Sequence, residues 1–240
     1  MQKVAIDSET EEFYATSLRT LREGGVPFMV GGAYALGEYA DIYRDTKDLD
    51  VFCTAGQYPR LLQVLADAGY ETEITDATWL AKASQGEHLV DVIFASANGV
   101  APVDDAWFEH ARRVELFGCE VRLIPAEELL WKKIMLQDRH RFDGADVNHI
   151  IRKQGESLDW KRLLQRMEPN WEALLGSLIV FRYVYPAERD FVPRWLMEEL
   201  LTRVQQQLEV PTPVEKVCRG PLLSKGQYAI DIEEWGYRLR

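Results

Sequence analysis

Apolar positions in the first half of the chain alternate between two spacings. Three segments show the spacing of a helix with one buried face: a helix capped by Ser8 and ended by Gly24, then residues 33–39 and 58–68. Six shorter segments have the apolar character of strands: residues 26–30, 49–53, 70–75, 78–83, 88–95 and 119–123. This alternation predicts a mixed α/β (α+β) domain with one small sheet over residues 1–123.

The pattern changes after Pro125, where only the helical spacing continues. The segments expected to be helical are residues 126–137, 145–152, 160–167, 171–185 and 194–208. From Glu209 onward, prolines and glycines interrupt the apolar runs. We therefore predict a helical domain over residues 124–208 and an extended tail over residues 209–240. In this tail, Arg219, Lys225 and Tyr228 would either close over a neighbouring site as a lid or strap the tail to the helical domain.

The composition is that of a globular protein, because 47% of the 240 residues are hydrophobic and 28% are charged. The net charge of −11 disfavours nucleic acid or an anionic membrane as the main partner, since the summed field repels phosphate. A local basic patch would escape that argument. No apolar run approaches the roughly 20 residues that a membrane span needs. Three scattered cysteines without metal-binding spacing fit a reducing cytoplasm.

The strongest chemical signal is a pair of carboxylates within one predicted strand. Side chains in a strand alternate between the two faces, so Asp48 and Asp50 project from the same face while Leu49 points to the other. Two carboxylates held this close repel each other, and a divalent cation such as Mg²⁺ is a common compensation. Asp91 lies in a second apolar strand, where a neighbouring position in the sheet would add a third ligand. Its alternatives are a pairing with an arginine or a surface position.

Gly31 and Gly32 follow a predicted buried strand and precede a predicted helix. Backbone N–H groups at such a helix start can receive a phosphate, and glycine allows the close approach that this needs. The alternative is an ordinary turn. Lys47, next to the acidic pair, would either neutralise phosphate or remain an exposed side chain.

These pieces, taken in order along the chain, resemble the nucleotidyltransferase superfamily that includes DNA polymerase beta. The similarity is to its small bacterial branch of aminoglycoside nucleotidyltransferase-like and AbiEii/MenT toxin-like proteins, and it extends over residues 26–147. The resemblance implies a Mg²⁺-dependent transfer of a nucleoside monophosphate from a nucleoside triphosphate (NTP), such as ATP, to an acceptor hydroxyl, with release of pyrophosphate. It also implies that Asp48 and Asp50 bind the metal ions, and that Asp91 completes the site and helps to activate the hydroxyl.

The same resemblance extends to a basic segment in the second half. Residues 131–166 contain nine basic and five acidic residues, a net charge of +4 (9 − 5). One interpretation is a solvated helix matched to its dipole, and the other is that Lys132 or Lys133 binds the triphosphate. Toxin-like relatives imply the phosphate role for Lys133 and a place in the site for Asp146. Asp143 and Asp146 would equally well cap the following helix.

Many relatives carry Gly-Ser where this chain has Gly31-Gly32, so backbone amides or Lys47 would replace the serine hydroxyl. Without that serine, a catalytically weak nucleotide-binding module or a toxin–antitoxin component of the same fold is the alternative function. A hydrolase that uses the carboxylates for acid–base chemistry is a weaker third. The acceptor is open: a small cationic molecule suits the acidic total charge, whereas an RNA end or a protein hydroxyl suits the +4 segment.

Overall fold

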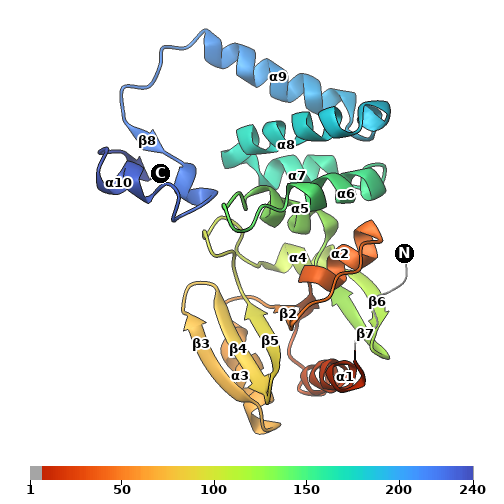
Figure 1. Ribbon diagram of the computed structural model, residues 1–240. Coiled ribbons are helices and arrows are strands. Elements are labelled where there is room, and N and C mark those ends of the chain that lie inside the picture. The colour runs from red at the N-terminus through yellow and green to blue at the C-terminus, as the bar shows by residue number, and fades with distance from the viewer. Residues whose placement is uncertain (1–6, 240) are drawn as a thin grey trace. The chain divides into compact units, whose positions relative to one another are not determined.

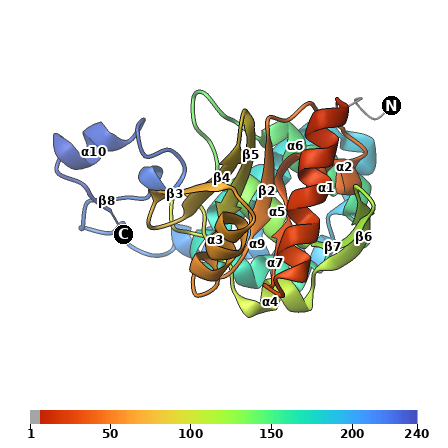
Figure 2. The ribbon, with the colours of Figure 1, turned by 90° about the horizontal axis from the view of Figure 1, so that it is seen from below.

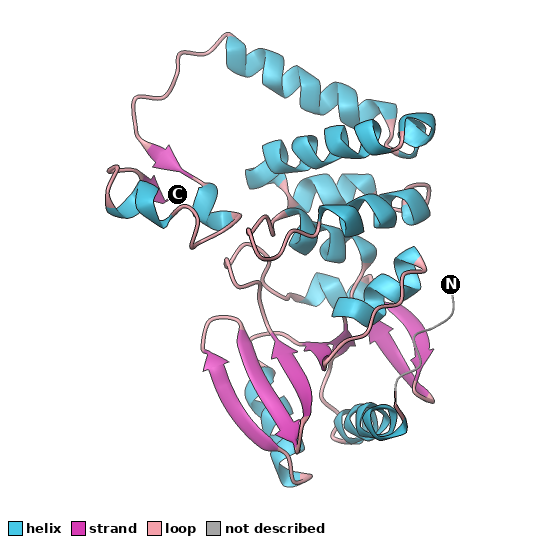
Figure 3. Ribbon diagram, viewed as in Figure 1, coloured by secondary structure: helices cyan, strands magenta, loops and turns pink. Residues whose placement is uncertain are grey.

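The computed structural model describes residues 7–239 and divides the chain into two compact units, Met1–Leu129 and Leu130–Arg240. Helix α5 (Ala126–Ile134) begins in the first unit and ends in the second. Strands are concentrated in the first unit and helices in the second, as Figure 3 shows by colour. Among the helices that the structure describes, none has the length and the apolar composition required to span a membrane.

The first unit contains one mixed sheet of seven strands in the order β3-β4-β5-β2-β1-β7-β6. The strands are β1 (Met29–Val30), β2 (Asp48–Phe52), β3 (Glu71–Asp76), β4 (Leu80–Gln85), β5 (His88–Ile93), β6 (Arg112–Leu116) and β7 (Cys119–Leu123). The pairs β2–β5 and β1–β7 are parallel, and the other pairs are antiparallel. The predicted mixed α/β class is therefore confirmed.

The helices of this unit are α1 (Ser8–Glu23), α2 (Gly32–Ala40), α3 (Tyr58–Asp67) and α4 (Asp105–Glu109). Helices α1 and α3 pack against each other and against strands of the sheet, as seen in Figure 2. The face of α1 that the sequence predicts to be inward is indeed buried, with Leu18 and Leu21 inaccessible to solvent. The predicted cap is wrong by one residue, because Asp7 accepts the backbone N–H groups of Glu9 and Thr10.

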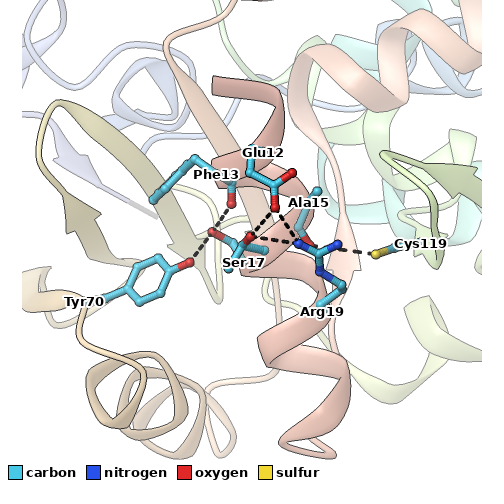
Figure 4. A network of polar contacts seen from close by, with 8 residues as sticks. Glu12, Phe13, Ala15, Ser17, Arg19, Tyr70 and Cys119 are labelled. Atoms are coloured by element: carbon cyan, nitrogen blue, oxygen red, sulfur yellow. Dashed lines mark hydrogen bonds and ion pairs between the residues drawn. The ribbon is translucent and has the colours of Figure 1, made fainter. Parts of the chain in front are cut away.

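Helix α1 is also held by a buried polar contact (Figure 4). The hydroxyl of Ser17 lies 2.8 Å from the carbonyl oxygen of Phe13 and 2.8 Å from the hydroxyl of Tyr70. Ser17 is completely buried, so these hydrogen bonds satisfy a polar group that would otherwise be costly to bury. They fix α1 to the residue that precedes β3, on the same sheet that carries the acidic strands.

Three elements of the first unit differ clearly from the predictions. Strand β1 has two residues in place of the five expected over 26–30, and Pro27, which lacks a backbone N–H, falls outside it. Strand β6 and the short helix α4 were not predicted. β6 is an edge strand with mostly exposed side chains, so it lacks the apolar signal of a buried strand.

The second unit is built mainly from helices, with two short strands near its end (Figure 1). After α5 come α6 (Gly144–Gln154), α7 (Trp160–Arg166), α8 (Trp171–Val184) and α9 (Arg194–Leu208), with the 3₁₀ turns η1 (Glu168–Asn170) and η2 (Pro186–Phe191). Helix α8 packs on both α6 and α9. Its buried residues Leu174, Leu178 and Phe181 recur at helical spacing and form the centre of this unit.

The sequence predicts an extended tail over residues 209–240, but the end of the chain contains short regular elements. It contains β8 (Val217–Cys218), η3 (Gly220–Leu222), α10 (Ala229–Glu233) and β9 (Arg238–Leu239), and the two strands pair in parallel. These elements are two to five residues long, which is too short for a clear hydrophobic period in the sequence. We call residues 217–239 the C-terminal segment.

Candidate active site

The three predicted acidic residues lie on one face of the sheet, on neighbouring strands. Strands β2 and β5 run parallel, and Asp50 is directly opposite Asp91 in their register. Asp48 is two residues before Asp50 and therefore projects to the same face. Leu49 and Val51, between and after them, are fully buried on the other face. The strand period and the register together place Asp48, Asp50 and Asp91 side by side.

Asp48 is oriented by the residue that enters its strand. The hydroxyl of Thr46 donates a hydrogen bond of 2.8 Å to Oδ1 of Asp48. Asp48 is only partly exposed, so this bond fixes the carboxylate while leaving its second oxygen for another ligand. Thr46 was not among the predicted site residues.

Asp91 is the acid with the most perturbed environment. Nζ of Lys82, on the adjacent strand β4, lies 3.6 Å from Oδ1 of Asp91. This is an ion pair slightly longer than a hydrogen bond, and that buried oxygen has no hydrogen-bond partner among residues 7–239. Burial raises the pKa of Asp91 above its usual value, Lys82 opposes this, and the negative charge of Asp48 adds to it. Asp91 thus combines a buried orphan oxygen with a raised pKa, a combination typical of functional carboxylates.

The two glycines bring the start of helix α2 against the acidic strand. The backbone N–H of Gly31 donates to the carbonyl oxygen of Asp50 at 3.0 Å. Gly32 has a positive φ of 54°, and a Cβ atom at this position would overlap the carboxyl group of Asp50. Only glycine therefore allows this close approach. The Asp50 carboxylate is held at the positive end of the α2 dipole, which favours negative charge there.

Two tyrosines border the acids without having been predicted. The rings of Tyr14 on α1 and Tyr34 on α2 meet edge to face, with centroids 5.8 Å apart. Burial raises the pKa of Tyr14 to about 12, with the charge of Asp48 as a further cause. Burial also raises the pKa of Tyr34 far above its usual value, and Tyr14 and Asp48 add to the shift. Both hydroxyls therefore stay neutral beside the carboxylates.

The chemistry of the acidic group fits a hard divalent cation. Its donors are all carboxylate oxygens, the ligands that Mg²⁺ prefers, and one of them is buried without a hydrogen-bond donor. As the side chains stand, however, no three His, Cys, Asp or Glu residues within 7–239 are gathered closely enough to hold a metal ion. Metal binding would therefore require the carboxylates to turn, in particular Asp91, which now faces Lys82.

The predicted lysines differ in their surroundings. Lys47 is exposed. Lys133 belongs to the second unit and its ammonium group is ion-paired, at 2.9 Å with Asp143 and 2.8 Å with Asp146. Asp143 occupies the N-cap position of α6, but its side chain makes no capping hydrogen bond. The prediction that the Asp143 side chain caps α6 is therefore wrong, because its carboxylate pairs with Lys133.

Lys82 is the charged partner that sequence reasoning missed. It alternates with the buried residues Ala81 and Ala83, so strand period alone places it on the opposite face from them. What the sequence does not give is the register of β4 against β5, which sets Lys82 opposite Asp91. The sequence feature that could have indicated this partner is a single lysine among the apolar residues of the first half of β4 (Leu80–Gln85).

Comparison with solved structures finds a similar fold in one protein at a TM-score of 0.50, and weaker similarity to others. An antigenic nucleotidyltransferase-like protein from Paracoccidioides brasiliensis is 16% identical, with a TM-score of 0.50 over 79% of this chain and 96% of that one. The antibiotic-resistance factor ANT(2")-Ia, solved with adenylyl-2"-tobramycin, is 15% identical, with a TM-score of 0.47 over 74% of this chain and 99% of that one. The lincosamide antibiotic adenylyltransferase LnuA, solved with lincomycin, is 16% identical, with a TM-score of 0.41 over 62% and 98%. At such identities the likeness concerns the fold.

No curated protein sequence matches this chain. A family model described as "Uncharacterised nucleotidyltransferase" does match, over residues 14–181 of the 240. The match includes the strands with all three acidic residues and the helix start at Gly31 and Gly32. Because it extends over well more than half of the chain, we conclude that the chain belongs to this family of nucleotidyltransferases.

Proposed function

We propose that this chain transfers a nucleoside monophosphate from an NTP to an acceptor hydroxyl and releases pyrophosphate. A bond forms between the acceptor oxygen and the α-phosphorus, and the bond between that phosphorus and the bridging oxygen of the pyrophosphate breaks. The observation that carries this proposal is the placement of Asp50 opposite Asp91, next to Asp48 and in contact with Gly32. This puts three carboxylates beside a helix start that favours anions.

Asp48, Asp50 and Asp91 would hold Mg²⁺. When bound, the metal would neutralise charge on the phosphates and on the attacking oxygen. The electrostatic repulsion between three carboxylates on one sheet face would then be offset when Mg²⁺ binds. The single lysine paired with Asp91 offsets only part of it in the free protein.

Asp91 is the candidate proton acceptor. Its raised pKa makes it a stronger base than an ordinary aspartate. In our proposal one of its carboxylate oxygens accepts the proton of the acceptor hydroxyl, and Lys82 positions the carboxylate and limits the rise in its pKa.

The triphosphate contacts are assigned to Gly31, Gly32, Lys47 and Lys133. The two glycines would offer backbone N–H groups at the start of α2. Lys47 is exposed and has a flexible side chain that can reach an anion. Lys133 has three ammonium donors, of which Asp143 and Asp146 take two. In this arrangement it retains one donor for a phosphate oxygen.

The test is incubation with Mg²⁺ and each α-labelled NTP, offered with basic small molecules, with an RNA pool and with protein acceptors. We expect transfer of label that depends on the three acids, with Asp50→Asn lowering the rate about 10³-fold or more. The matched control is Asp45→Asn, which removes an exposed carboxylate from the preceding loop and should leave the rate unchanged. Equal transfer by Asp50→Asn and the native chain would overturn the proposal.

A binding module of the same fold remains the alternative, because Gly32 stands where many relatives have serine. Calorimetry with each NTP and Mg²⁺ separates the two functions. Tight NTP binding without label transfer to any acceptor supports the module, whereas binding with Asp50-dependent transfer supports the enzyme. Absence of NTP binding contradicts both.

A further inference from the structure

The second unit contains a cavity of about 550 Å³, which is in the size range of small-molecule sites. Its walls come from the end of α5, the start of α6, one side of α8 and the C-terminal segment. Most of the lining is apolar, including Val147, Val180 and Leu223. Among these lining residues, Lys133 is shared with the proposed transfer reaction, whereas Asp48, Asp50 and Asp91 are not among them.

The charged groups of this lining are already paired. Only Lys133, Glu172 and Arg219 carry charge among the lining residues. Lys133 is neutralised by the buried carboxylate of Asp146 and the partly buried one of Asp143, and Nη1 of Arg219 lies 3.5 Å from Oε2 of Glu172. A charged ligand would have to compete with the largely buried ion pairs of Lys133, which is costly. The pair of Arg219 with Glu172 is half exposed and costs less to break, but it also leaves neither charge without a partner.

Uncharged polar groups are present in the same lining. Asn148 is 6% exposed, and its side-chain oxygen has no hydrogen-bond partner in the described part of the chain. Asn170, Ser177 and Tyr228 add amide and hydroxyl groups around the cavity. The carboxamide of Asn148 can turn to accept a hydrogen bond from a ligand without losing a protein contact. From the cavity, its paired charges and this orphan oxygen we infer that the second unit has a binding site for an uncharged, largely apolar small molecule.

The C-terminal segment supplies one wall of this site. The carbonyl oxygen of Leu223 accepts the backbone N–H of Gln137 at 3.1 Å. The buried hydroxyl of Ser224 donates to Asp138 at 2.6 Å. The segment, dark blue in Figure 1, is thus fixed to the loop that follows α5. The end of the chain is therefore attached to the helical unit and forms one wall of the cavity. This agrees with the strap, one of the two roles that the sequence left open for the tail.

A substitution in helix α8 can fill the cavity without displacing neighbouring atoms. Gly176 lies within this helix and lines the cavity, and a Cβ atom built on it meets no other atom within 4 Å. Its backbone is helical, so a larger residue is sterically allowed and raises helix propensity. Gly176→Trp should fill the cavity, whereas Gly176→Ala changes the helix in the same sense and leaves the cavity open. Ala173→Phe, one turn earlier on the same lining, is a second filling variant if the tryptophan variant does not fold.

The experiment uses three dansyl probes with the same apolar body and different ends: dansylcadaverine with its amine, its N-acetyl form, and dansyl-6-aminohexanoate. Dansyl emission rises in an apolar site, so each probe is titrated into the full-length native chain without NTP. We expect the neutral N-acetyl probe to bind about tenfold more tightly than either charged probe. Gly176→Trp should weaken this binding at least tenfold, and Gly176→Ala should leave it unchanged.

Binding of either charged probe as tight as that of the neutral probe would overturn the inference. So would equal binding of the neutral probe by the Gly176→Trp and Gly176→Ala variants, or no binding by the native chain. Thermal unfolding of each variant confirms that it is folded before titration. Because NTP is absent, the result does not depend on the proposed transfer reaction.

Discussion

The two units of this protein handle charge in opposite ways. In the first unit, strand period and parallel register force Asp48, Asp50 and Asp91 onto one face, and Lys82 lies 3.6 Å from Asp91. In the second unit, helices bring opposite charges together, as in the group formed by Lys133 with two aspartates. The lesson is that a net charge says little about where free charge lies.

This difference revises the meaning of the basic segment over residues 131–166. Its net charge of +4 suggested a phosphate-binding face, but Lys133 is neutralised locally, and Arg152 pairs with Glu188 at 2.9 Å. Charges that are paired this way stabilise the helical unit more than they attract a distant anion. The carboxylates of the first unit remain the group that gains most from a bound cation.

The largest expected effect is on Lys133. Lys133→Met removes the cation that lies 2.8 Å from the buried carboxylate of Asp146 and 2.9 Å from the partly buried one of Asp143. The pair of Asp143 with Arg141 is longer, at 3.8 Å. We therefore expect the free energy of unfolding to fall by about 3–5 kcal/mol. Arg152→Met is the control, since its pair with Glu188 is partly exposed, and should cost less than about 1 kcal/mol. Denaturant unfolding of the full chain measures both. Similar losses for the two variants would show that the group around Lys133 is no more than an ordinary surface pair.

A smaller effect is expected where the helix start meets the acidic strand. Gly32→Ala adds a Cβ atom that overlaps the Asp50 carboxyl group at a positive φ, and should cost about 2–3 kcal/mol. Gly118→Ala is matched to it, because Gly118 has a φ of 70° but no atom within 4 Å of its Cβ position. It should cost only about 1 kcal/mol. Equal losses in thermal unfolding would mean that Asp50 does not rest on Gly32 in solution.

The next effect has the opposite sign. The pKa of Asp91 is raised in the folded state, so the folded chain binds this proton more tightly than the unfolded chain does. Stability should therefore fall as pH rises from the ordinary aspartate range through the raised pKa, and the penalty persists above it. Asp91→Asn removes the charge and should stabilise the metal-free protein at neutral pH by an amount on the order of 1 kcal/mol.

The measurement is the melting temperature across pH in the presence of a chelator. The Asp91→Asn variant should melt higher than the native chain at neutral pH, and the difference should shrink as the pH is lowered. Asp45→Asn, which changes an exposed carboxylate, should leave the melting temperature unchanged. A native chain that melts higher than Asp91→Asn at neutral pH would show that the pair with Lys82 outweighs the burial of Asp91.

Local patterns in the sequence were sufficient for much of the fold. Strand β7 and helix α9 have the predicted bounds, because each has a full apolar period between clear breaks. The placement of Asp48 and Asp50 on one face was predicted for the same reason, since side chains alternate between the two faces of an apolar strand. Strand β6 was missed because most side chains of this edge strand are exposed, so its sequence lacks the alternation of apolar and polar residues that marks a half-buried strand.

Contacts between distant parts of the sequence could not be predicted in the same way. The register of β4 on β5 decides that Lys82 meets Asp91, and no local pattern fixes a register between strands. The partners of Lys133 were named as residues, but their role depends on the packing of α5 against α6. The anchoring of Ser224 to Asp138 likewise joins residues 86 positions apart.

That last contact gives the smallest and most local prediction. The hydroxyl of Ser224 donates to Asp138, and the backbone N–H of His140 donates to the same side chain, so the pKa of Asp138 lies below its usual value. Ser224→Ala removes the larger cause and should raise the pKa of Asp138 toward the ordinary value, which a carboxyl ¹³C titration by NMR can follow.

Ser177→Ala is the control, because this residue also lines the cavity and is not in contact with Asp138 through any hydrogen bond described for residues 7–239. It should leave that titration unchanged. A pKa of Asp138 that stays equally low in the Ser224→Ala variant would mean that the C-terminal segment is not held against the loop after α5 in solution. The cavity would then lose the wall that the C-terminal segment forms. The pKa of Asp138 therefore tests whether the helical unit has the cavity whose paired charges we contrast with the acidic face of the first unit.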